Sequence, residues 1–324
     1  MHEIDTRTAA AEVRRRHKFT NLLHSAVLLL GMVLLLGACG WLVAGWEGVM
    51  WAFLAGALSV AFSPRVSPRL VLGLFGARRL HYAVAPRLFE VVAAVAGRAG
   101  LPAVPELHYI ASPTLNAFAV GGREQAAIAV TDGILRELSL RELAGVLAHE
   151  ISHIRNNDLW VMGLADTVAN VTRTMAMFGM ILLIFNLPLM LMEQEPVPWA
   201  LVLLLTAAPW VGALLQLALS RTREFDADLD AAHLTGDPEG IASALLRIER
   251  TQGAFWEGVM LPRRRGGALP SLLRTHPHTR ERVARLMELR TPPPVLPDLE
   301  RLPVHVAFPQ VRRRPRYRMS GYWY

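Results

Sequence analysis

One run of residues has the types and spacing that metal chemistry needs, His149-Glu150-Ile151-Ser152-His153. In a helix, residues four positions apart lie on one face, about one turn from each other, so the two imidazoles can converge on a single ion. Zinc is the expected ion, because it takes histidine nitrogens at about 2.0–2.1 Å. Glu150 lies beside that face, where it can remove a proton from a water molecule at the metal. The motif predicts a hydrolytic zinc site rather than a chance match in a helix.

A catalytic zinc ion needs a third protein ligand and one open position. In one motif class, a glycine and a third histidine follow the second histidine after three and six residues. Asn156 and Leu159 occupy these two positions here, which excludes that class. The best candidates are Glu224 and Asp228, which share one helical face. One could bind the metal while the other hydrogen bonds to a ligand imidazole, and the spacing does not decide which. The alternative is a solvated acidic face paired with Arg221 and Arg223.

The composition indicates a membrane protein. Of 324 residues, 52% are hydrophobic and only 19% charged, whereas a soluble globule carries nearer a quarter charged residues. Cys39 is the single cysteine, which excludes a disulfide scaffold. The net charge of +7 is almost all arginine and could suit nucleic acid or anionic lipid, so the placement of the charges must decide.

Apolar runs predict four membrane spans. The second is short and needs Trp46 and Trp51 near the interface, with Gly45-Trp46-Glu47-Gly48 as the preceding connection. A cleaved signal peptide is the alternative for the first run, but that run is too long and a second follows at once. The four predicted spans are 22–44, 49–62, 174–192 and 198–219.

Charged flanks orient these spans. Arginines flank all four on one side, whereas the two short connections contain Glu47 and then Glu193 and Glu195, without a basic residue. The positive-inside rule therefore places both termini and both soluble segments in the cytoplasm. Much of the positive charge thus acts as a topology signal, and no nucleic acid is expected as a partner.

The two soluble segments predict an α+β domain with a small β-sheet, joined through the second pair of spans. A capping box at Ser139 opens the motif helix, which we expect to continue through Asp158. The other expected helices are 87–99, 238–252 and 279–289, and the expected strands are 106–110, 116–120 and 126–130. The chain divides into a basic segment with the first hairpin (1–66), the first half of the catalytic domain (67–162), the second hairpin (163–219), the second half (220–290) and a Pro/Arg-rich tail (291–324).

Together these motifs resemble the HtpX family of integral-membrane zinc metallopeptidases, gluzincins related to the CAAX prenyl endopeptidases. The similarity covers roughly 22–289 and includes the order of the spans. It rests on four stretches: 148–154 with Asp158, 220–228, Asn116-Ala117-Phe118-Ala119 with Gly121, and Thr275-His276-Pro277. The chain departs from the family in its longer ends and in His278, where relatives often have a second proline.

The resemblance implies a role for each matching residue. His149, His153 and Glu224 would bind one Zn²⁺ per chain, Glu150 would be the general base, and Asp228 would support a ligand. Asn116 would lie at an edge strand that holds the substrate backbone. His276 could stabilise the oxyanion, with a simple turn residue as the alternative.

The function implied is a membrane-embedded zinc endopeptidase that cleaves damaged or misfolded membrane proteins, or other unfolded polypeptides, on the cytoplasmic side of the bacterial inner membrane. Processing of prenylated peptides is the alternative within the same chemistry. A membrane scaffold with a structural zinc ion is the alternative from another class, although such a site has no use for Glu150. The arginines of the tail could contact anionic lipid, with a solvated tail as the alternative.

Overall fold

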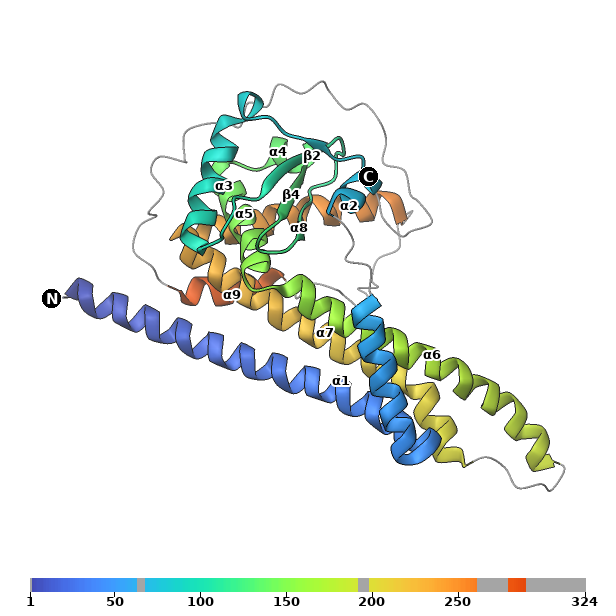
Figure 1. The fold of residues 1–324 in the computed structure, drawn as a ribbon. Coiled ribbons are helices and arrows are strands. Elements are labelled where there is room, and N and C mark those ends of the chain that lie inside the picture. The colour runs from blue at the N-terminus through green and yellow to red at the C-terminus, as the bar shows by residue number, and fades with distance from the viewer. Residues whose placement is uncertain (1, 63–67, 192–197, 261–278, 290–324) are drawn as a thin grey trace.

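The computed structural model describes residues 2–62, 68–191, 198–260 and 279–289. Long apolar helices form an elongated stem, and a smaller part with a β-sheet lies at one end of it (Figure 1). His276, the connection 192–197 and the tail 291–324 lie outside the described residues.

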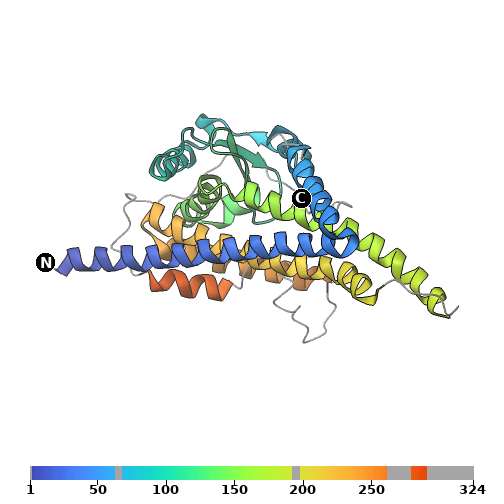
Figure 2. The same ribbon diagram turned by 60° about the horizontal axis from the view of Figure 1, so that its bottom comes forward.

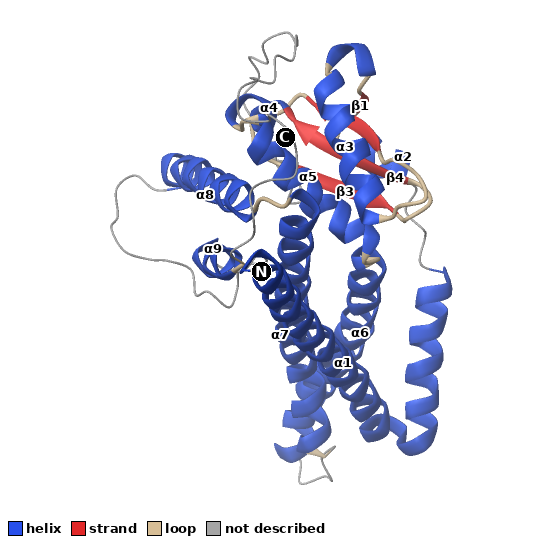
Figure 3. Cartoon of the chain, turned by 90° about the vertical axis from the view of Figure 1, so that its left-hand side faces the viewer, coloured by secondary structure: helices blue, strands red, loops and turns tan. Residues whose placement is uncertain are grey.

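In the described residues, three helices are long and apolar enough to cross a membrane, α1 (His2–Phe62), α6 (Asp158–Leu191) and α7 (Trp199–Thr235). The helix α1 is interrupted at Ala44 and Gly45, where Gly45 has a φ of 57°, and the chain then folds back. A Cβ atom on Gly48 would overlap the carbonyl oxygen of Gly40, so the two limbs of α1 touch backbone to backbone. Figure 3 shows the second limb running beside the stem. The first two predicted runs are thus both helical, and the break is shorter than the expected four-residue connection.

The predicted continuity of the motif helix through Asp158 is wrong. The helix α5 (Leu140–Arg155) ends at Asn156, and α6 begins at Asp158. Between them Asn157 has a φ of 55°, a left-handed conformation that asparagine tolerates better than most residues. The break redirects the chain from the sheet-bearing part into the stem.

The small sheet has the strand order β1-β2-β4-β3. β2 (Glu106–Ile110) pairs parallel with β4 (Ala126–Thr131), and β3 (Ala117–Gly121) pairs antiparallel with β4 at the edge of the sheet. The three strands expected from the sequence are present within one residue at each end. The elements not expected are α2 (Pro68–Leu74), β1 (Arg78–Arg79), the 3-10 turn Tyr82–Val84 and α4 (Asp132–Glu137).

The strand β4 shows why the sheet is buried on both faces. Ile128 and Val130 join the main core with α5, whereas Ala127 and Ala129 face a second cluster with Leu72 of α2. The main core also receives α3 (Pro86–Ala99), α8 (Pro238–Met260) and α9 (Thr279–Glu288). The sheet-bearing part therefore draws its core from both halves of the sequence, one before and one after the α6–α7 hairpin.

Close packing of α6 on α7 predicts that this hairpin assembles the metal site. A Cβ atom on Gly179 of α6 would lie 2.5 Å from Cβ of Leu205 in α7, so Gly179→Leu must force the helices apart, at a cost of about 1–3 kcal/mol. We expect this variant to bind less metal than the wild type, as measured by elemental analysis of purified protein. Gly163→Leu in the same helix is the matched control, because an added Cβ there meets nothing within 4 Å. Full metal content in Gly179→Leu would show that metal binding does not depend on the packing of the hairpin.

Candidate metal centre

The helix α5, which carries the two histidines, is capped at its N-terminus and packed on the core along one face. Ser139 caps it, since Oγ accepts a hydrogen bond from the Glu142 backbone N–H and the Glu142 carboxylate accepts one from the Ser139 N–H at 2.8 Å. Leu147, Ile151 and their neighbours bury one face of α5 in the core. The opposite face of α5, which carries the motif, faces α7.

His149, His153 and Glu224 come together in one group, with ligand atoms all within 4.8 Å of one another. The two Nε2 atoms are 3.1 Å apart, and the Glu224 carboxylate oxygens lie 3.5 Å from Nε2 of His149 and 3.8 Å from Nε2 of His153. Ligands at tetrahedral angles around zinc, each at about 2.0–2.1 Å, are separated by roughly 3.3 Å. Two imidazole nitrogens and one carboxylate oxygen at these separations fit the donor set of a catalytic zinc ion.

The structure distinguishes between the two acidic residues that the spacing left equivalent. Glu224 lies against the Nε2 atoms, whereas Asp228 Oδ1 lies 3.0 Å from Nδ1 of His149, on the far side of the ring. Glu224 thus sits where a ligand would, and Asp228 sits where it can orient an imidazole. Both side chains are buried, so the alternative of a solvated acidic face is wrong.

Asp158 does for His153 what Asp228 does for His149. Its Oδ2 is 2.7 Å from Nδ1 of His153, and its Oδ1 accepts a hydrogen bond from Nε of Arg223 at 2.6 Å. The break after α5 allows this contact, because it returns the first residue of α6 to the end of α5. Sequence reasoning placed Asp158 within a continuous helix, and only the resemblance singled it out.

Arg282 of α9 is a buried residue of this centre that the sequence analysis missed. It contacts Asp228 with Nε and Nη2, both at 2.6 Å, and its Nη1 lies 3.1 Å from Glu224. Arg282 shares a face of α9 with the buried Leu286, and the buried Leu289 directly follows the helix, so an arginine in line with apolar residues was the available signal. One guanidinium thereby offsets part of the negative charge of the cluster.

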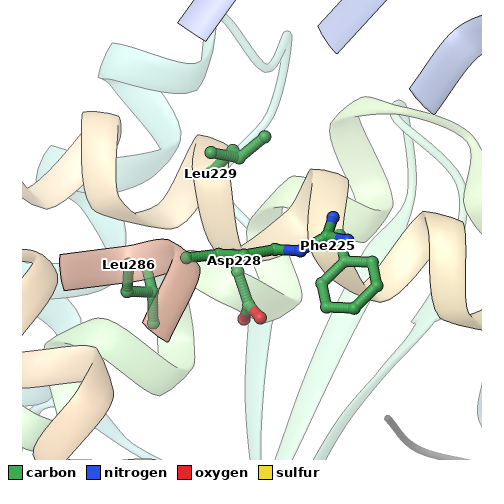
Figure 4. A pocket seen from close by; sticks show the side chains of 5 residues that line it. Phe225, Asp228, Leu229 and Leu286 are labelled. Carbon is green, nitrogen blue, oxygen red and sulfur yellow. The ribbon is translucent and has the colours of Figure 1, made fainter. Parts of the chain in front are cut away.

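Figure 4 shows the junction that holds α9 on α7, with Asp228 between Phe225 and Leu286 and with Leu229 along the same helix. Arg285 stacks its guanidinium 3.7 Å from the centre of the Phe225 ring. These contacts keep Arg282 beside the two acidic residues of α7.

Glu150 lies between the histidines and the edge strand of the sheet. Its Oε2 accepts a hydrogen bond of 3.0 Å from the backbone N–H of Ala119 in β3. Burial raises the pKa of the Glu150 carboxyl above its ordinary value, opposed by His149 and His153, while Glu224 raises it further. A carboxylate with a raised pKa beside His149, His153 and Glu224 is suited to accepting and returning a proton.

The acidic neighbours of His149 control its protonation. Burial alone would lower its pKa, but hydrogen bonds to Asp228 and Glu224 outweigh burial and raise the pKa to about 10. A raised pKa favours the protonated ring, so a metal ion competes with a proton for His149.

Asn116 is the last of the predicted site residues within the described part of the chain. It is exposed and lies directly before β3, where its backbone N–H donates to Oγ1 of Thr131 at 3.0 Å. Since the Ala119 N–H points towards Glu150, the alternating residues of β3 direct their backbone groups to the same open edge. Asn116 itself directs its backbone groups towards Thr131 of β4, so it precedes the open edge rather than forming part of it, and His276 lies outside the described residues.

Comparisons with known proteins agree on one family. Residues 83–290 match Peptidase family M48. The chain is 36% identical over 283 residues to a protease HtpX homolog of Methylibium petroleiphilum, which covers 83% of this chain and 98% of that protein. A protease HtpX homolog of Burkholderia ambifaria is 35% identical over 281 residues, covering 83% and 97%.

Among solved structures, the crystal structure of S. mikatae Ste24p aligns with a TM-score of 0.49 and 18% sequence identity. The alignment covers 84% of this chain. The chain spans 66% of the length of that protein.

Proposed function

The chain belongs to peptidase family M48 and is a metalloprotease, and on this premise we propose that it is a zinc-dependent endopeptidase of a membrane. The observation that carries the proposal is the convergence of His149, His153 and Glu224 next to a glutamate, Glu150, that does not belong to the metal group. A purely structural metal site has no use for such a base.

Glu150, Asp228 and Asp158 each have a distinct part in the proposed reaction. Zinc, when bound, would polarise the scissile carbonyl and acidify water. Glu150 takes the proton from the attacking water and later delivers it to the leaving amine. Asp228 and Asp158 hold the two ligand imidazoles through their Nδ1 atoms.

The edge strand β3 is the proposed binding site for the substrate backbone. An extended peptide would add to the open edge of β3, beginning near Asn116, as in other cases of β-strand addition. The peptide would also compete with Glu150 for the N–H of Ala119, which would free the carboxylate for the attacking water. His276 remains our proposed donor to the oxyanion, by resemblance to the family.

The setting we propose is the bacterial inner membrane. The two limbs of α1 with α6 and α7 would provide four spans, and the positive-inside rule favours a cytoplasmic metal site and cytoplasmic termini. Damaged or misfolded membrane proteins are the proposed substrates, by resemblance to the HtpX family, to whose named members this chain is similar.

Metal dependence tests the proposed function directly. We expect the full-length protein, purified in detergent, to contain about one zinc ion per chain and to cleave an unfolded test protein such as reduced, alkylated casein. A chelator should abolish cleavage, and added zinc should restore it, as followed by gel and by mass spectrometry of the fragments. Folded, zinc-loaded protein that cleaves no unfolded or membrane substrate would contradict the proposal.

A further inference from the structure

A chain of buried polar side chains joins the helix α1 to the metal group. Nδ2 of Asn21 donates to Oδ1 of Asp226 at 2.8 Å, and Nη1 of Arg223 donates to the other oxygen of Asp226 at 2.9 Å. Arg223 also donates from Nε to Asp158 at 2.6 Å, and Asp158 lies 2.7 Å from Nδ1 of His153. Four contacts thus connect residue 21 to a proposed metal ligand on α5.

Because its side chains are buried, this series of hydrogen bonds depends on each of its members. Asn21, Asp226 and Asp158 are each no more than 4% exposed, and Arg223 is 9% exposed. A buried polar group that loses its partner is left without water to replace it, so the neighbouring groups must shift to compensate. Since Arg223 contacts both Asp226 and Asp158, a movement at one carboxylate reaches the other.

We propose that Asn21 is a positioning residue for the metal centre. By fixing Asp226, it sets the orientation of the Arg223 guanidinium, which holds Asp158 against His153. The helix α1, which lies along α7 in Figures 1 and 2, is thereby part of the support of the metal site. This inference rests on the proposed function, in which His153 binds zinc.

A parallel contact one turn earlier offers a matched control. Nζ of Lys18 donates to Oδ1 of Asp230 at 2.8 Å, and Asn156 donates to the other oxygen of Asp230 at 3.0 Å. This contact also ties α1 to α7, but it leads to Asn156 at the end of α5 rather than to Asp158. Removing it tests the anchoring of α1 while the hydrogen bonds from Asn21 through Asp226, Arg223 and Asp158 remain in place.

Zinc release tests the proposal. The full-length, zinc-loaded protein in detergent is mixed with a chromophoric chelator, and the rate of zinc transfer is recorded for each variant. Outer partners of metal ligands typically change metal affinity by about 10–100-fold, and two further groups, Asp226 and Arg223, separate Asn21 from Asp158. We therefore expect release from Asn21→Ala to be roughly 3- to 10-fold faster than wild type, with Lys18→Met close to wild type and Asp158→Asn fastest.

An exchanged pair provides a rescue. In Asn21→Asp with Asp226→Asn, the amide at position 226 can donate to the carboxylate at 21 and accept from Arg223, and the total charge is unchanged. We expect this double variant to release zinc more slowly than Asn21→Ala. If Asn21→Ala does not fold, the double variant decides: release near the wild-type rate supports the proposal, and fast release from folded protein overturns it.

The outcomes separate the two proposals. Wild-type release from Asn21→Ala, with fast release from Asp158→Asn, would overturn the role of Asn21 and leave the metal site intact. Equal acceleration in Lys18→Met would also overturn it, because general anchoring of α1 would then explain the effect. A folded wild-type protein that binds no zinc would instead contradict the proposed function.

Discussion

Replacing Glu150 by glutamine is expected to lower the rate of peptide cleavage by roughly 10²- to 10⁴-fold, the range of a lost general acid–base group, while zinc content stays at the wild-type level. The amide keeps the shape of the side chain and can still accept the hydrogen bond from the Ala119 N–H, but it cannot take a proton from water. Cleavage of an unfolded protein and zinc content measured on the same preparation would check both halves of the prediction.

The control for this variant is Glu239→Gln. Glu239 lies in the first turn of α8 with its side chain 73% exposed, so the same change of charge should leave cleavage unaffected. Cleavage by Glu150→Gln at the wild-type rate would remove Glu150 from the reaction, whatever the metal content.

Isosteric amides at Glu224 and Asp228 are expected to separate a ligand from its neighbour. Glu224→Gln removes one of three proposed ligands, about a third of a binding free energy that is roughly 10–16 kcal/mol in structural zinc sites, so zinc affinity should fall on the order of a thousandfold or more. Asp228→Asn weakens the support of His149, and we expect a loss of roughly 10- to 100-fold. Titration with a competing chelator would rank the two variants.

Added zinc distinguishes these variants further. Because its ligands remain, Asp228→Asn should recover metal and cleavage at higher zinc concentration, whereas Glu224→Gln should not. Both variants need unchanged thermal unfolding of the metal-free form for the comparison to hold. A larger loss in Asp228→Asn than in Glu224→Gln would reverse the assignment of the two residues.

Local patterns determined much of this protein in advance. The spacing of His149 and His153 and the cap at Ser139 depend only on helix geometry, so the motif helix and the shared face of its two histidines could be predicted. The apolar runs and the alternating strands follow from the same short-range rules, and the three predicted strands agree with β2, β3 and β4 within one residue.

The elements that escaped prediction are short or depend on one backbone angle. The strand β1 has two residues and α4 has six, which is too few for a periodic pattern to emerge. The break at Asn157 depends on a single left-handed residue within an otherwise helical pattern. Yet this break returns Asp158 to His153, so one unpredicted angle provides the carboxylate partner of a proposed metal ligand.

Contacts between distant segments were decided only by the tertiary structure. Glu224 and Asp228 are equivalent by spacing, and they differ because the packing of α7 on α5 places one at the Nε2 atoms and the other at Nδ1. Arg282 and Asn21 reach this region from opposite ends of the chain. Helical periodicity tells which side chains share a face, but not which other face they meet. That choice is made by the packing of the whole core, to which residues far apart in the sequence contribute together.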